Sequence, residues 1–174
     1  MESPTLKTIE YRGGVVRFRI PTDWVEEYED AGGGTFYKPG DNTGTLRLEV
    51  LGGTTPPGKV ATAAYLAELL ASDAAKYGVA TIPVGENAVM VRYNMPAEER
   101  GQPLKIRTWR IFQALPPSTL RHALFTYTVL ADKFDQPGSV AEMELLDREI
   151  AALELAPVIG QTPSASKKPW WRPW

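Results

Sequence analysis

Apolar residues that alternate with polar ones constrain the fold of this chain more than any other feature of its sequence. In residues 15–20, three apolar side chains alternate with Arg17 and Arg19, and residues 45–51 repeat the pattern around Arg47 and Glu49. Period-two alternation is typical of a strand that buries one face, so both segments are predicted strands. The residues expected to face inward are Val16, Phe18, Ile20, Leu46, Leu48 and Val50.

Further strands follow in blocks instead of alternating with helices. Turn sequences rich in Gly, Pro and Asn separate these segments from one another. Strands that run in blocks indicate an α+β protein with an antiparallel sheet. The remaining predicted strands are 9–11, the hairpin of 24–29 and 35–37, 81–84, 88–95, 104–115 and 120–131.

Two helices complete the predicted fold. The first covers residues 60–77 and ends at Gly78, a residue suited to a helix C-terminus. The second covers residues 140–155, with Ser139 and Glu142 as a capping box. We expect both helices to pack on the same apolar face of the sheet. The apolar stripe of the second helix comprises Met143, Leu146, Ile150 and Leu153.

The lack of cysteine in a chain with one histidine narrows the available chemistry. Disulfides, cysteine-ligated zinc and thiol nucleophiles are excluded. His122 alone cannot form a His-pair metal centre, and we expect it to be a buried, hydrogen-bonded residue. No P-loop, nucleophile elbow or zinc-protease motif occurs. We therefore expect no catalytic residue, no metal and no cofactor.

Length and charge set the domain organisation and exclude some partners. The 174 residues suit one domain, predicted over residues 1–155, with a disordered Pro/Lys/Trp-rich tail over residues 156–174. A net charge of −2 provides no field for capturing nucleic acid. No apolar run approaches the roughly 18 residues that span a bilayer, and no secretory signal is visible at the start. The expected location is the cytoplasm.

A family resemblance enters at residues 18–24, which read Phe-Arg-Ile-Pro-Thr-Asp-Trp. A glycine-containing hairpin, a strand over Leu46-Arg47-Leu48, a long helix, long strands and a terminal helix follow. This order resembles the Mog/PsbP-like superfamily over residues 9–155. The resemblance implies an α+β sandwich and a protein-binding role, because members of this superfamily are binding proteins. It supplies no catalytic residue.

Outward strand positions carry several basic side chains. If the second face of the sheet is open, these side chains make a basic surface with an aromatic platform, suited to an acidic partner. The alternative is an ordinary solvated face, on which Glu49 pairs with some of the arginines. The candidate residues are Arg17, Arg19, Arg47, Arg92, Lys105, Arg107 and Trp109.

Two other segments are candidate binding sites. Residues 23–30 gather acids around two aromatics, either as a recognition hairpin for a basic partner or as an edge strand that resists aggregation by charge. Residues 167–174 combine cations with tryptophan, which suits a membrane surface, a partner groove or the chain's own domain. The candidate residues are Glu26, Glu27, Glu29, Trp170, Trp171 and Trp174.

These patterns favour a non-catalytic protein-binding module, such as an adaptor, chaperone or immunity-type protein. One alternative is a small-molecule binder or enzyme with a pocket between sheet and helices, near His122, Tyr93 or Trp109. A second alternative is a peripheral membrane protein that acts through its Trp-rich tail. The sequence does not identify the partner or the oligomeric state.

Overall fold

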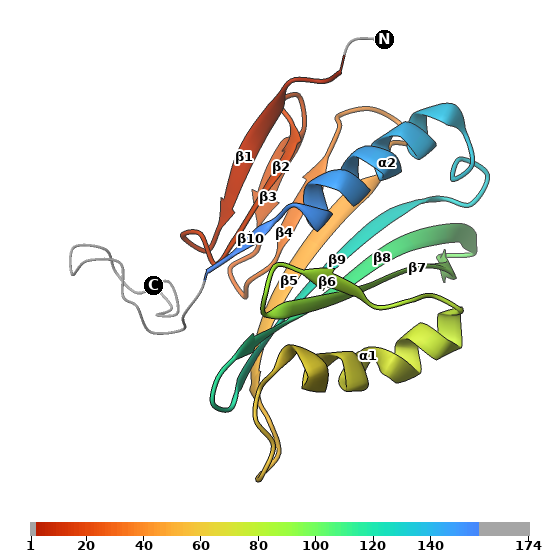
Figure 1. Ribbon diagram of the computed structural model, residues 1–174. Coiled ribbons are helices and arrows are strands. Elements are labelled where there is room, and N and C mark those ends of the chain that lie inside the picture. Colours follow the sequence, from red (N-terminus) through yellow and green to blue (C-terminus); the bar gives the residue numbers. More distant parts are fainter. Residues whose placement is uncertain (1–2, 157–174) are drawn as a thin grey trace.

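The computed structural model describes residues 3–156 as two antiparallel sheets and two helices (Figure 1). This is an α+β fold, as the sequence predicts. The helices are α1 (Ala63–Tyr77) and α2 (Pro137–Ala151). The strands are β1 (Leu6–Tyr11), β2 (Val16–Pro21), β3 (Val25–Tyr28), β4 (Gly34–Tyr37), β5 (Thr45–Thr54), β6 (Ile82–Val84), β7 (Ala88–Glu99), β8 (Gln102–Leu115), β9 (Thr119–Leu130) and β10 (Glu154–Leu155).

The sheets pack as layers, with a helix on each side of the larger one. The seven-stranded sheet has the order β3-β4-β5-β9-β8-β7-β6, and the three-stranded sheet has the order β1-β2-β10. The small sheet and α2 cover one face of the large sheet (Figure 1). Helix α1 packs on the opposite face, against β7 and β8. The long strand β9 is central, as predicted.

The prediction that both helices cover one face is wrong. Neighbouring residues of β7 show why: Val89 and Val91 pack in the cluster beneath α1, whereas Ala88 and Met90 belong to the core on the other side. A strand whose odd- and even-numbered residues are both apolar must be covered on both faces of the sheet. Helix α1 therefore covers apolar residues on one face of the large sheet, and α2 covers those on the other.

We call the face under α2 and the small sheet the closed face, because it holds the main core. The predicted inward residues of β2 and β5 lie in this core, where Phe18 packs edge-on against Phe36 and Phe125 at ring distances of 5.4 and 5.1 Å. Leu46 and Leu48 are completely buried. Each fully buried side chain of this kind contributes about 1.5–3 kcal/mol, so the closed face supplies much of the stability.

The end of α1 agrees with the prediction, whereas its start, expected at residue 60, lies at Ala63, and both ends of α2 differ. The Thr62 side chain accepts a hydrogen bond from the Tyr65 N–H at the start of α1, and Gly78 ends the helix at a φ of 63°. Helix α2 instead begins at Pro137, whose fixed φ suits the first helical position, and no side chain caps it. The predicted capping box at Ser139 is therefore wrong.

The predicted end of the second helix is also wrong. Helix α2 ends at Ala151, and the chain then extends to form β10, which pairs with β2. Leu155 lies opposite Val16 in this ladder, and the Ala156 N–H donates to the Val15 carbonyl. The last residues of the described chain thus belong to the small sheet.

Candidate binding surface

The basic and aromatic residues predicted to share one surface lie in three separate places. Arg17 and Arg19 are on β2, where they pair with acids of α2, β1 and β10, and Arg47 lies on the large-sheet face opposite α2. The prediction of one basic surface is therefore wrong. Alternation tells which residues of one strand share a face, but it does not tell which residues of another strand lie on that same face. The remaining residues lie on the closed face, namely Arg92, Lys105, Arg107 and Trp109.

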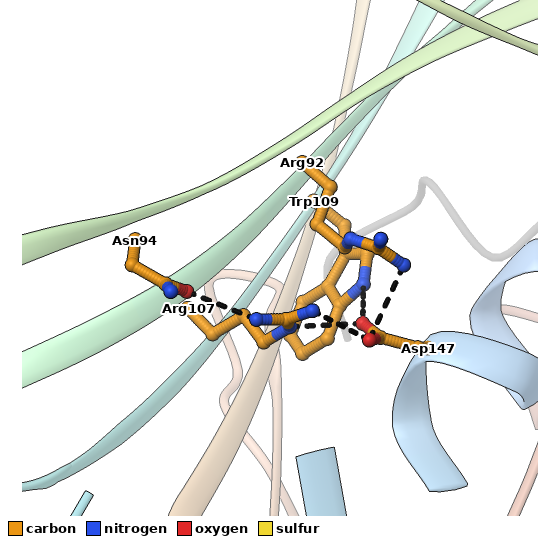
Figure 2. A network of polar contacts seen from close by, with 5 residues as sticks. All are labelled: Arg92, Asn94, Arg107, Trp109 and Asp147. Atoms are coloured by element: carbon orange, nitrogen blue, oxygen red, sulfur yellow. Dashed lines mark hydrogen bonds and ion pairs between the residues drawn. The ribbon is translucent and has the colours of Figure 1, made fainter. Parts of the chain in front are cut away.

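Three of these closed-face residues meet at a carboxylate of α2 (Figure 2). Asp147 accepts two hydrogen bonds from Arg107, at 2.9 and 2.5 Å, and one from the Trp109 indole at 3.0 Å. Arg92 lies 3.2 Å from the same carboxylate, and Asn94 accepts from Arg107 at 3.2 Å. The network joins α2 to β7 and β8.

This network anchors α2 to the large sheet through largely buried side chains. Trp109 is completely buried, and the side chains of Arg107 and Asp147 are 17% and 19% exposed. Asp147 was missed in the sequence reasoning, although a signal exists. It lies four residues after Met143 and three before Ile150, so it falls inside the apolar stripe of the helix. A carboxylate in that position predicts a buried cation opposite.

The acidic hairpin also has partners within the chain. Glu26 pairs with Lys7 at 2.9 Å, and hydrogen bonding to Lys7 holds the pKa of Glu26 below its usual value. Glu27 accepts a hydrogen bond from the Tyr37 hydroxyl at 2.6 Å, and Trp24 is buried against Tyr127. Strand β3 is an edge strand, as the aggregation-resistance interpretation requires.

The other predicted candidates lie in the turn after β3 and in the C-terminal segment. Glu29 is exposed in the turn after β3 and remains a candidate. Trp170, Trp171 and Trp174 lie outside the described residues.

The face opposite α2 is covered only in part, and we call its uncovered area, over β5 and β9, the open face. Helix α1 packs over β7 and β8, with Val89 and Val91 beneath it. On β5, Leu51 is 58% exposed and pairs in register with His122 of β9. The next strand continues this row with Phe112, whose ring stacks on the His122 imidazole at 4.2 Å. Leu51, His122 and Phe112 thus form a partly exposed apolar and aromatic strip across three neighbouring strands.

The environment of His122 keeps its imidazole neutral. Burial, followed by the nearby Arg110 charge, lowers the pKa of His122 from 6.5 to about 4. Its Nε2 atom is buried and has no hydrogen-bond partner among the described residues. The expectation of a hydrogen-bonded histidine is therefore wrong for this nitrogen. The imidazole ring stacks on the ring of Phe112, which has no polar atom to bind it.

Two opposite charges lie on the open face without ion pairs in the described part of the chain. Arg47 and Glu49 are both exposed on β5, and the expected pairing of Glu49 with strand arginines is absent between residues 3 and 156. Arg110 instead pairs with Asp73 of α1 at the border of the face. Open charges beside a partly exposed apolar strip are typical of a contact surface.

The open face also has a polar hollow at its other end. The hollow measures about 290 Å³ and lies where β5 and β9 meet the turns before β5 and before β8. Arg47, Thr45, Thr128 and Glu99 contribute to its lining. The open face therefore has an apolar end near Leu51 and a polar end near Arg47.

The pocket expected near His122, Tyr93 and Trp109 does not form from these three residues. Trp109 belongs to the closed face, whereas His122 and Tyr93 face the other way. Tyr93 stacks on Tyr77 of α1 at 3.8 Å. A separate cavity of about 190 Å³ lies beside α2, between Trp24 and Leu145.

Within residues 3–156, no group of three or more metal-ligating side chains is arranged around a common point. Neither helix in this part of the chain has both the length and the apolar character needed to cross a bilayer.

Comparison with known proteins supports the fold and leaves the function open. No protein-family model matches the chain, and no curated protein sequence matches it. A crystal structure from Bacteroides thetaiotaomicron is similar with a TM-score of 0.57 and 18% identity, over 86% of this chain. This chain spans about half of that protein (48%).

A second similar solved structure is matched over most of its own length. LpqN of Mycobacterium tuberculosis, described as involved in cell envelope biogenesis, is similar with a TM-score of 0.53 and 10% identity. The match covers 83% of this chain and 88% of LpqN. At such identities the likeness shows the α+β fold alone. Neither description names the Mog/PsbP-like superfamily, so that resemblance stays a prediction.

Proposed function

We propose that this chain is a non-catalytic protein-binding domain that binds its partner through the open face. The observation that carries the proposal is the partly exposed strip across β5, β9 and β8, where Leu51 is 58% exposed beside the stacked pair of His122 and Phe112. Exposed apolar side chains bordered by charges mark surfaces that a second protein covers.

The contrast with the other candidates supports this choice. The basic cluster on the closed face is occupied by Asp147, and Glu26 and Glu27 of the acidic hairpin have partners in their own chain. Arg47 and Glu49 on the open face have no such partners within residues 3–156. Charges left open in this way are available to fix the orientation of a partner.

A small-molecule binder is the second candidate, favoured by one observation. The polar hollow of about 290 Å³ joins the cation of Arg47 to the hydroxyls of Thr45 and Thr128. This lining suits a small polar ligand, and the volume of the hollow is close to the lower end of the range for ligand pockets, about 300 Å³. A thermal-shift screen of polar metabolites tests this candidate, and loss of any shift in an Arg47→Ala variant would assign it to the hollow.

The proposal places the chain in the cytoplasm and gives it neither nucleic acid nor an integral membrane role. The description of LpqN offers the cell envelope as the alternative location. Fractionation of source cells, followed by detection of the chain, decides between these two. Membrane contact through residues 167–174 is tested separately by liposome binding of the full chain and of a Trp170→Ala/Trp171→Ala/Trp174→Ala variant.

Affinity capture from a source lysate tests the binding role when variants are compared side by side. Wild type, Leu51→Lys, Leu51→Glu and Tyr28→Lys each serve as bait. Leu51 and Tyr28 are 58% and 53% exposed, but only Leu51 lies on the open face. Urea unfolding of every bait checks that it is folded, because the Tyr28 ring also packs against Tyr11 and Phe36. We expect a protein that wild type and Tyr28→Lys capture equally and that both Leu51 variants lose.

The opposite pattern of capture would contradict binding through the open face. Capture lost with Tyr28→Lys and kept by the Leu51 variants assigns binding to the acidic hairpin. Equal capture by all four baits assigns it to neither surface.

A further inference from the structure

The last described residue is held by a buried polar pair at one end of the large sheet. The Ala156 carbonyl accepts hydrogen bonds from Gln113 Nε2 at 3.1 Å and from Arg121 Nη1 at 3.0 Å. Gln113 and Arg121 are 1% and 5% exposed and also bind each other at 3.0 Å. Burial lowers the pKa of Arg121, so its charge is held here against a desolvation cost. The point from which residues 157–174 start is therefore fixed.

This anchor lies directly behind the apolar end of the open face. Gln113 directly follows Phe112 on β8, and Arg121 directly precedes His122 on β9. Phe112 and His122 are the stacked pair of the open face. Successive residues of a strand point to opposite faces. The anchor on the closed face and the apolar strip on the open face are therefore the two sides of the same strand segments.

The length of the remaining chain is sufficient to pass from one side to the other. Trp170 is fourteen residues beyond Ala156, a span of up to about 46 Å when extended. The β8–β9 turn at Pro117 is four residues from Arg121, so a path around it to the open face is roughly 30 Å. The tryptophans reach the strip with several residues to spare.

The composition of residues 167–174 matches the open face in two ways. Trp170, Trp171 and Trp174 suit the apolar strip, since indole rings bury a large area against Leu and aromatic side chains. Three cations, Lys167, Lys168 and Arg172, suit the carboxylate of Glu49, which is exposed two residues from Leu51 on the same face. Glu49 has no ion pair within residues 3–156.

We propose that the chain's own residues 167–174 dock on the open face, with the tryptophans over Leu51 and His122 and the cations beside Glu49. The inference rests on the proposed function and adds its regulation. The segment covers the binding strip until a partner displaces it, so the free chain does not present an exposed apolar surface.

Paramagnetic broadening in the full-length chain tests this docking directly. The chain has no cysteine, so a Ser166→Cys substitution places one nitroxide label next to the Trp-rich segment. We expect selective loss of amide signal intensity at Leu51, His122 and Leu124. Adding Leu51→Lys and Glu49→Lys should restore these intensities, whereas adding Tyr28→Lys should not.

Three outcomes would overturn the inference. Broadening centred on β3 would place the segment on the acidic hairpin, and an absence of localised broadening would leave it undocked. Broadening that appears when a labelled chain is mixed with an isotope-enriched unlabelled chain, and not within one chain, would indicate a second copy as the occupant.

The same variants separate this inference from the proposed function. Capture that depends on Leu51 without broadening of the open face overturns only the docking. Broadening of the open face with capture that is insensitive to both Leu51 variants overturns the binding role and leaves the docking in place.

Discussion

The two faces of the seven-stranded sheet are built from the same alternating strands and have opposite characters. Along β5, Leu46, Leu48 and Val50 are buried in the closed face, while Leu51, one residue beyond Val50, is 58% exposed on the other. The closed face is covered by α2 and the small sheet, and the open face only by α1 at β7 and β8.

The charged side chains of the two faces also differ in their partners. On the closed face, Asp147 takes up the hydrogen bonds of Arg107 and Trp109, so the charges there hold the layers together. On the open face, Arg47 and Glu49 have no ion pair within residues 3–156. Substitutions on the closed face should therefore change stability, and those on the open face should change binding.

The largest expected effect is at Asp147. Its replacement by alanine leaves Arg92 and Arg107 facing each other without a counter-charge, and breaking a buried pair from one side costs about 3 kcal/mol or more. The control is Asp73→Ala on the α1 side, where the pair with Arg110 is more exposed and contributes about 1 kcal/mol or less. Urea unfolding measures both. Equal losses would erase the distinction between the faces.

A second contrast lies within one strand. Leu48→Ala opens a cavity in the closed face and should lower the free energy of unfolding by about 3 kcal/mol. Leu51→Ala, three residues along β5, removes an exposed side chain and should change it by no more than about 0.5 kcal/mol. Thermal unfolding of the two variants checks the pair. A loss for Leu51→Ala as large as that for Leu48→Ala would mean that the two faces do not differ in this way.

The N-terminus of α1 should have a moderate effect. Thr62→Ala removes the side-chain oxygen that accepts the Tyr65 N–H, and the loss should be about 1 kcal/mol. Thr62→Ser keeps the acceptor and is the matched control. If both variants are equally stable in urea, the cap does not contribute as the contact suggests.

The smallest expected effect is the pH dependence that His122 adds. Its pKa is about 4 in the folded chain and 6.5 in the unfolded one, so the unfolded chain binds more protons between these values. The stability that neutral His122 provides is complete above pH 6.5 and is lost as the pH falls toward 4. The slope should stay below the limit of about 1.4 kcal/mol per pH unit set by one proton, because the side chain is only half-buried.

A variant isolates that slope. His122→Gln should flatten the dependence of unfolding free energy on pH between 4 and 6.5. An unchanged slope would assign the proton uptake to another group.

The strand segments and the closed-face core were predictable because alternation and turns are local signals. Val16, Phe18 and Ile20 face the core as their spacing indicates, and the hairpin of β3 and β4 lies where the glycine loop predicts it. Gly78 ends α1 as expected.

The assignment of residues to faces was not predictable in the same way. Alternation says that Arg47 and Glu49 share a face, but strand register decides whether Arg107 joins them, and register depends on contacts between distant residues. The Asp147 network needed one further step, because an acid inside an apolar stripe indicates a cation without saying which strand supplies it.

Binding through the open face is tested by measuring affinity and stability on the same three proteins. Once the captured protein is purified, calorimetry gives its dissociation constant for wild type, Leu51→Lys and Tyr28→Lys, and urea unfolding gives the stability of each. Placing an unpaired charge in a desolvated contact should weaken binding by Leu51→Lys about tenfold or more. Stability should change by no more than about 0.5 kcal/mol. An unchanged dissociation constant for Leu51→Lys, with a weakened one for Tyr28→Lys, would contradict the central claim that the open face is the binding surface.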